Sequence, residues 1–349
     1  MKEPLLSHLV DPLREMVCQF SMIIAGFRER SGARVAGTVC DILPAEIPAS
    51  LGLVPVRVPL AGGCCAAAGL PGIGDIGSIY DCIVVPRGCA GRDGLGRPGV
   101  PLFEFTSPPG WGEAAARAMA SSLDELLAAT GCGGIASLDA ARLRTVTAEY
   151  NALRRLVRGI GSLRNGRPGL LSCADLAAVH EAAAVFPPAA VAEQLASLLE
   201  AMNAAGGPVL PPPLPVLVYA GFAAGAPVLD ELEEAGCRIV EDDACGGRRQ
   251  FDMSYNHESP DLLGEILDAF SYRPRCPSVR TVGERVELFY SMMKGQGIEL
   301  VVFIEDLCCP SRLRDIGALR VRLMRAGVDP LVVTTSNAVE KIQEYIAKM

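Results

Sequence analysis

The chain has 349 residues, of which 50% are hydrophobic and 21% charged, so it is long enough for about two domains with sizeable cores. Its formal net charge of -8 excludes nucleic acid as the main partner, because phosphate binding needs clustered lysine and arginine. We expect a cytoplasmic protein with no membrane partner, since no leader is visible and no apolar run approaches the ~20 residues of a span. Its 13 cysteines should then stay reduced, which leaves burial, metal binding or catalysis.

The first part of the chain alternates helical patterns with short apolar runs. Residues 5–30 have helical periodicity and predict one long helix. The segments that follow predict a strand, a short helix and three further strands, over residues 33–39, 44–51, 53–58, 82–85 and 102–105. Pro44 suits the start of the short helix, and Glu46 suits its dipole.

The middle of the chain is helical, and the alternation then returns. Helices are predicted over residues 112–129, 139–160, 173–185 and 188–204, with Ser137 and Ser172 as caps of the second and third. The stretch 206–215 is rich in Gly and Pro and marks a domain boundary. Strands are predicted over 216–219, 238–240, 298–304 and 330–333, and helices over 228–235, 260–270, 282–295, 311–326 and 337–348.

The pattern predicts an α/β fold with two Rossmann- or flavodoxin-like parallel-sheet domains and a helical middle region. The expected divisions are an N-terminal α/β domain with a helical lead over 1–130, a helical region over 131–207 and a C-terminal α/β domain over 208–349.

Cysteines recur just past the ends of the predicted strands, at Cys40, Cys89, Cys245 and the pair Cys308–Cys309. In open α/β sheets, ligands bind outside the carboxyl ends of the strands. If these ends face each other across a cleft, the thiols converge, as an iron–sulfur cluster requires.

Other uses of the cysteines remain open. Burial as small hydrophobes is the simpler interpretation for the cysteines inside elements or short connections: Cys18, Cys82, Cys132, Cys173 and Cys237. Cys245 and Cys276 fit either use. Zinc is disfavoured, because Cys64–Cys65 and Cys308–Cys309 are adjacent pairs, whereas zinc sites use C-x₂₋₄-C spacing.

The remaining motifs are weak. His180 falls in a predicted helix and is expected to be packed, and His257 is expected to be solvated. Residues 72–77 fit G-x-G-x-x-G but lack the flanking strand and helix of a dinucleotide site. Glu46 is most simply a helix-start residue, and its closeness to Cys40 makes it a candidate for proton transfer.

Several of these segments resemble the 2-hydroxyacyl-CoA dehydratase family, which includes 2-hydroxyglutaryl-CoA dehydratase D-components, benzoyl-CoA reductase subunits and double-cubane cluster proteins. The likeness covers nearly the whole chain. It is carried in order by residues 37–40, 44–47, 52–56, 81–82, 86–89, 151–155, 236–237, 243–248, 275–277 and 303–310.

The resemblance implies a 4Fe–4S cluster in the cleft between the two domains, held by Cys40, Cys89 and Cys308 with one iron left open. It implies a lyase that dehydrates a 2-hydroxyacyl-CoA through a ketyl radical, after reduction by an ATP-dependent iron–sulfur activator protein. A homologous second subunit or a homodimer is also implied.

Three features depart from the family and keep alternatives open. Cys64 and Cys65 fall between Cys40 and Cys89, so with Cys245, Cys276 and Cys309 they are possible additional ligands of a double-cubane 8Fe–9S cluster. That would make the protein an ATP-dependent reductase of small substrates; a benzoyl-CoA reductase-like subunit is a further alternative. The chain also lacks the family's acidic-aromatic and Thr-Arg segment after residue 336, which admits a non-catalytic cluster-binding role. Finally, the dehydratases and reductases of the family pair two related subunits, whereas this sequence is a single chain.

Overall fold

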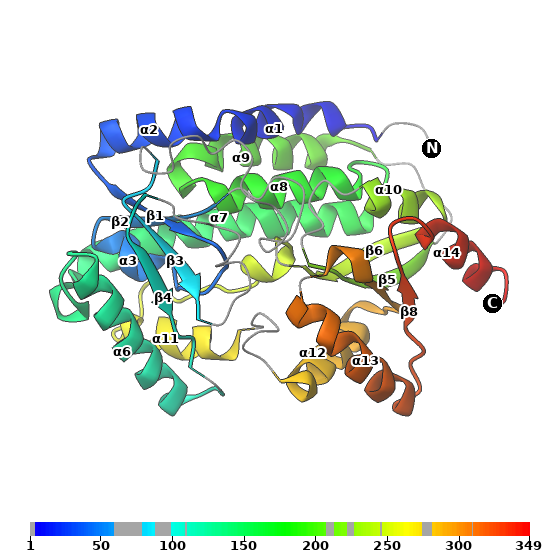
Figure 1. Ribbon diagram of the computed structural model, residues 1–349. Helices are drawn as coiled ribbons and strands as arrows, with labels where there is room; N and C mark the ends of the chain where they lie inside the picture. The colour runs from blue at the N-terminus through cyan, green and yellow to red at the C-terminus, as the bar shows by residue number, and fades with distance from the viewer. Residues whose placement is uncertain are drawn as a thin grey trace.

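The computed structural model describes residues 4–58, 79–87, 99–108, 110–206, 213–221, 227–244, 246–273, 281–308 and 310–349. Two parallel sheets lie beside each other, and a layer of helices runs across both of them (Figure 1). The α/β prediction with two parallel-sheet domains is confirmed. The domain boundaries at 130 and 207 stay predictions.

The two sheets have the same strand order. The first runs β2-β1-β3-β4, built from Leu53–Arg57, Arg34–Thr38, Cys82–Pro86 and Leu102–Phe105. The second runs β6-β5-β7-β8, built from Cys237–Asp243, Leu214–Tyr219, Leu300–Ile304 and Leu331–Val333. All pairings are parallel. In each sheet the strand order changes direction once, between β1 and β3 and between β5 and β7, and ligands bind at such switch points.

The longer helices of the described chain are α1 Asp11–Cys18, α2 Phe20–Ser31, α6 Glu113–Ala129, α7 Ala140–Gly166, α8 Cys173–Val185, α9 Pro188–Ala204, α10 Pro227–Glu234, α11 Leu262–Tyr272, α12 Val282–Gln296, α13 Pro310–Arg325 and α14 Ala338–Ile346. Helix α3 is a single short turn, Glu46–Ser50. Most match the expected ranges within a few residues.

Two local predictions are wrong. The single helix over residues 5–30 is divided at Gln19, which ends α1 and precedes α2, although the apolar spacing continues through the break. Ser137 does not cap α7, because it closes a separate 3₁₀ turn; the cap is Asp139, whose carboxylate accepts the Arg142 amide at 2.8 Å. Ser172 is confirmed as the cap of α8, where it forms a reciprocal capping box with Asp175.

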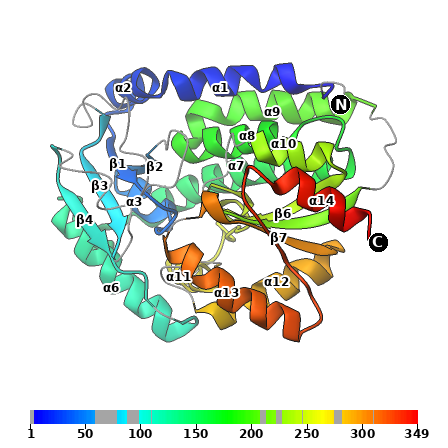
Figure 2. The same ribbon diagram turned by 45° about the vertical axis from the view of Figure 1, so that its right-hand side comes forward.

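Helix α7 ties the two sheets together (Figure 2). Near its middle, Arg154 pairs with Glu46 of α3, beside the first sheet. Near its end, the fully buried Arg164 donates to the carbonyl of Ile239 in β6 at 2.6 Å and pairs with Glu233. One rigid helix therefore fixes the position of one sheet against the other.

The core of the first sheet is completed from the second half of the chain. Phe270 and Ile266 of α11 pack into one buried cluster with Leu123 of α6 and Phe105 of β4. Burying side chains of this size stabilises the fold by about 1.5–3 kcal/mol each. Separating the halves would expose this surface. No helix of the described residues is long and apolar enough to cross a membrane.

Candidate functional site

Cys40 lies just past the carboxyl end of β1, at the first switch point. Its side chain is buried, and the preceding residue, Val39, donates its amide to the carbonyl of Val84 in β3 at 3.2 Å. Gly37 lets β1 pack closely here, because an added Cβ would lie 3.0 Å from the ring of Tyr80. The position predicted for this thiol at the end of a central buried strand matches the structure.

Cys308 lies past β7, the strand that takes in the second sheet the place that β3 takes in the first, and so it also adjoins a switch point. It follows the 3₁₀ turn Glu305–Leu307, and its buried thiol donates to the carbonyl of Ile304 at 3.2 Å. The turn is fastened to the end of β5 by the amide of Gly221, which donates to the Leu307 carbonyl at 2.8 Å. Only glycine fits there, because a Cβ on residue 221 would lie 2.1 Å from that oxygen.

The other candidate ligands lie outside the described residues: Cys64, Cys65, Cys89, Cys245, Cys276 and Cys309. The G-x-G-x-x-G match at 72–77 lies outside them too. Within the described ranges, no three His, Cys, Asp or Glu side chains are grouped so as to hold a metal ion. The predicted set Cys40, Cys89 and Cys308 therefore stays a prediction.

The cysteines assigned to plain burial behave differently from one another. Cys82, Cys173 and Cys237 are buried, and burial raises the pKa of all three thiols, to about 11 for Cys82 and about 12 for Cys237. Such thiols are poor thiolate donors. Cys132 is partly buried. The prediction is wrong for Cys18, which is exposed at the end of α1.

Near the two candidate ligands lies a set of charges that we name the arginine network: the buried Asp243, Arg249, Arg273, Arg285 and Arg312, and the partly buried Asp41. Asp41, next to Cys40, pairs with Arg273, and Arg273 donates to the Arg249 carbonyl at 3.1 Å. Burial lowers the pKa of Arg273 to about 9, while nearby Cys40 favours its charged form. The contact with the Asp41 carboxylate acts in the same direction as Cys40, and Arg273 is therefore a cation in the fold.

Asp243, at the end of β6, is the centre of the arginine network. It pairs with Arg285, accepts from Arg249 at 2.9 Å, and its carbonyl accepts from Arg312 at 2.6 Å. Burial alone would raise the pKa of Asp243, but the three guanidinium groups outweigh it and hold the pKa well below its usual range. Its carboxylate is therefore ionised.

The arginine network reaches Cys308 through Tyr219. The ring of Tyr219 lies 4.7 Å from the Arg312 guanidinium and 5.7 Å from that of Arg285. Tyr219 and Cys308 are close enough to interact electrostatically, and both belong to one buried cluster. The donor chemistry fits an iron–sulfur cluster, since the two described candidate ligands are buried thiols, Cys40 close to the Arg273 guanidinium and Cys308 beside Tyr219, whose ring contacts Arg312.

Glu46 is fully buried in the first turn of α3, and its carboxylate pairs with Arg154. The Arg154 guanidinium lies between two aromatic rings, 5.8 Å from the centre of Tyr150 and 5.2 Å from that of Tyr255. Asn151 fixes the second ring by pairing with the backbone of Tyr255, at 2.6 and 3.1 Å. Glu46 is thus the helix-start residue expected, but its partner comes from a distant helix.

Three buried oxygens around this ion pair make no hydrogen bond to a described residue: Glu46 Oε2 and the hydroxyls of Tyr150 and Tyr255. Buried polar atoms are nearly always satisfied, by protein or by ordered water. A cavity of about 80 Å³ opens beside them, lined by Tyr150, Arg154 and Cys40. Arg154, the partner of Glu46, and Cys40 therefore line the same cavity.

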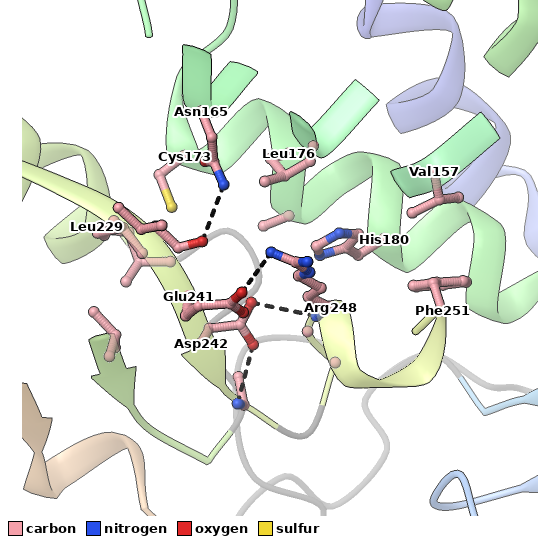
Figure 3. A pocket seen from close by; sticks show the side chains of 18 of the residues that line it. Val157, Asn165, Cys173, Leu176, His180, Leu229, Glu241, Asp242, Arg248 and Phe251 are labelled. Carbon is pink, nitrogen blue, oxygen red and sulfur yellow. Dashed lines mark hydrogen bonds and ion pairs between the residues drawn. The ribbon is translucent and has the colours of Figure 1, made fainter. Parts of the chain in front are cut away.

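A second cavity, of about 60 Å³, lies at the end of β6 against α7 and α8 (Figure 3). His180 is stacked on Phe251 at 5.5 Å, and burial lowers its pKa to about 4. Burial raises the pKa of Glu241 to about 7, and its ion pair with Arg248, at 2.5 Å, opposes that rise. The prediction that His180 is packed is confirmed; so is the solvated state of His257, whose side chain is 40% exposed.

Asp242, which lines this cavity, holds two backbone amides just after the end of β6. Its carboxylate accepts the amides of Ala244 at 3.0 Å and Arg248 at 3.2 Å. An added Cβ on Gly247 would lie 1.5 Å from the same carboxylate, so glycine is required there. One acidic side chain thus fixes the backbone at Ala244 and at Arg248.

One protein-family model matches residues 93–347, the model of the 2-hydroxyglutaryl-CoA dehydratase D-component. The chain belongs to this family. The match includes Cys308 and the described arginines of the arginine network, whereas Cys40 and Glu46 precede it. None of the curated proteins compared with the chain matches it.

Sequence reasoning missed most of the charges that surround the dehydratase-family cysteines. Arg154, Arg249, Arg273, Arg285, Arg312 and Asp243 were not predicted as site residues. The available signal was an arginine inside an otherwise apolar helical pattern, as in Leu153-Arg154. Long charged residues are almost never fully buried unless paired, so such a position indicates a buried partner elsewhere.

Proposed function

We propose that the chain is the iron–sulfur subunit of a 2-hydroxyacyl-CoA dehydratase-like lyase, with a 4Fe–4S cluster held by Cys40, Cys89 and Cys308. The family match makes it a dehydratase component. The observation that carries the finer proposal is the placement of Cys40 and Cys308, each buried past an inner strand at the switch point of one sheet. Cys40 lies close to Arg273 of the arginine network, and Cys308 lies beside Tyr219, which contacts Arg312.

A 4Fe–4S cluster bound here and reduced by an ATP-dependent iron–sulfur activator would supply the low-potential electron that dehydration of an acyl-CoA by a ketyl-radical route needs. The chain's own residues hold and surround the reacting group. Cys40 and Cys308 are the described ligands of the cluster, the arginine network provides positive charge near it, and the buried core excludes water. Glu46, fixed by Arg154, serves as the proton carrier beside the cavity at Cys40. The family name also supports a partner subunit and an acyl-CoA substrate.

The test is anaerobic turnover with a panel of 2-hydroxyacyl-CoA thioesters, a reduced activator and ATP. We expect loss of the 2-hydroxyl from at least one thioester, and loss of that activity in Cys308→Ala. Cys237→Ala is the matched control, because that thiol is equally buried but faces the apolar core of the second sheet. Iron-loaded protein that never turns over a thioester, with the partner subunit present, would favour the cluster-binding role.

A second candidate is a double-cubane reductase that uses Cys64, Cys65, Cys245 and Cys276. The favouring observation is that Asp242 accepts the backbone amides of Ala244 and Arg248, the described residues that flank position 245 in the sequence. A ligand loop needs such support. Reduction of a small substrate without any thioester turnover, and about eight irons per chain, would favour this candidate.

A further inference from the structure

The arginine network joins charges from distant parts of the chain. Arg249 follows β6, Arg273 follows α11, Arg285 lies on α12 and Arg312 lies near the start of α13. All four are at most 5% exposed. They surround Asp243 and Asp41, so the network holds four guanidinium groups and two carboxylates.

Buried ion pairs are poor devices for stability. Removing charges from water is costly, and apolar side chains of similar size often stabilise a fold as well or better. A cluster of buried arginines at one place therefore calls for another role. Positive charge held without water acts strongly on any nearby group whose charge changes.

Each proposed cluster ligand is related to a different member of this network. Arg273 interacts with Cys40 and pairs with Asp41, the next residue in the chain. At the other end, Arg285 and Arg312 lie against the ring of Tyr219, which adjoins Cys308. A cluster bound by these two thiols would therefore lie near members of the arginine network.

We propose that the arginine network sets the reduction potential of the cluster, by stabilising its reduced form through the positive charge of Arg249, Arg273, Arg285 and Arg312. This inference rests on the proposed function. The step is a one-electron transfer from the reduced activator, or from dithionite in a titration. The cluster and its thiolates become more negative by one charge, and no bond forms or breaks. Charge and hydrogen bonding near a cluster are known determinants of its potential.

The test is an anaerobic redox titration of the full-length protein with reconstituted cluster, followed by EPR. Arg285→Met removes a positive charge and should shift the one-electron equilibrium against reduction at least tenfold, which is 59 mV to lower potential. Asp243→Asn removes a negative charge and should shift the equilibrium the other way. Arg285→Lys keeps the charge and should stay close to wild type. Arg164→Met is the matched control, a fully buried arginine whose carboxylate partner is Glu233.

The opposite signs separate electrostatics from damage, because a loosened structure would move both variants in one direction. Arg312→Met replaces Arg285→Met if the latter does not fold. The inference is overturned if Arg285→Met and Asp243→Asn bind iron like wild type and keep its midpoint, or if both shift the same way. A wild-type protein that binds no iron overturns the proposed function as well, so the two failures are distinguishable.

Discussion

The ion pair between Glu46 and Arg154 gives the sharpest prediction for stability. Arg154→Met leaves the fully buried Glu46 carboxylate without its cation, and two aromatic rings without the guanidinium between them. Removing one partner of a buried pair costs about 3–5 kcal/mol, because the remaining charge stays uncompensated. Removing the cation from each aromatic ring adds about 0.5–2 kcal/mol. We therefore expect Arg154→Met to lower the free energy of unfolding by about 3–5 kcal/mol or more.

Urea denaturation of three variants measures this cost. Arg154→Met should destabilise more than Glu46→Gln, which keeps a group able to hydrogen-bond the guanidinium. The double variant should be less destabilised than the sum of the singles, since it removes both charges together. Arg155→Met is the matched control on the next, exposed position of α7. If Arg154→Met costs under about 1 kcal/mol, or if the two changes are additive, the buried-pair reasoning is refuted.

Two further predictions concern pH and backbone packing. Burial lowers the pKa of His180 from about 6.5 in an unfolded chain to about 4 in the fold. The neutral imidazole therefore makes its full contribution to the free energy of unfolding above pH 6.5, and this contribution is lost as the pH falls towards 4. Urea denaturation at pH 6.5 and at pH 4.5 gives the loss of unfolding free energy between the two pH values, and His180→Phe should reduce this loss by about 2 kcal/mol. If His180→Phe leaves the loss unchanged, His180 is not a buried neutral imidazole in the fold. Gly221→Ala places a Cβ against the Leu307 carbonyl and should cost about 1–3 kcal/mol. The control Gly166→Ala meets nothing within 4 Å and should be neutral or stabilising; equal effects from the two would contradict the close approach at Gly221.

The strands were predictable because most are short, continuous apolar runs bounded by loops, as in residues 298–304. Strand β6 was predicted to end at residue 240 but continues to Asp243. Its last residues are Glu241, Asp242 and Asp243, which are typical of a loop. Two of them are buried in the sheet, because Arg248 pairs with Glu241, and Arg249 and Arg285 pair with Asp243. Compensation of this kind depends on tertiary contacts and leaves no local pattern.

The candidate site, too, could be predicted only in part. Cys40 and Cys308 could be proposed from sequence, since each follows a strong strand pattern. The arginine network could not, because its members come from segments that only the fold brings together. The aromatic contacts of Arg154 could not be predicted either. Tyr150 lies on the same helix as Arg154, but Tyr255 comes from a distant segment, which a hydrogen bond from Asn151 joins to the helix across 104 positions.

The most direct test of the account is the iron and acid-labile sulfide content of the anaerobically purified chain. Wild type should carry about four of each and show the EPR signal of a reduced 4Fe–4S cluster. Cys40→Ala and Cys308→Ala should lose most of the iron, while Cys173→Ala and Cys237→Ala, whose thiols are buried away from the arginine network, should keep it. Full iron content in both Cys40→Ala and Cys308→Ala, or no iron in wild type, would contradict the account.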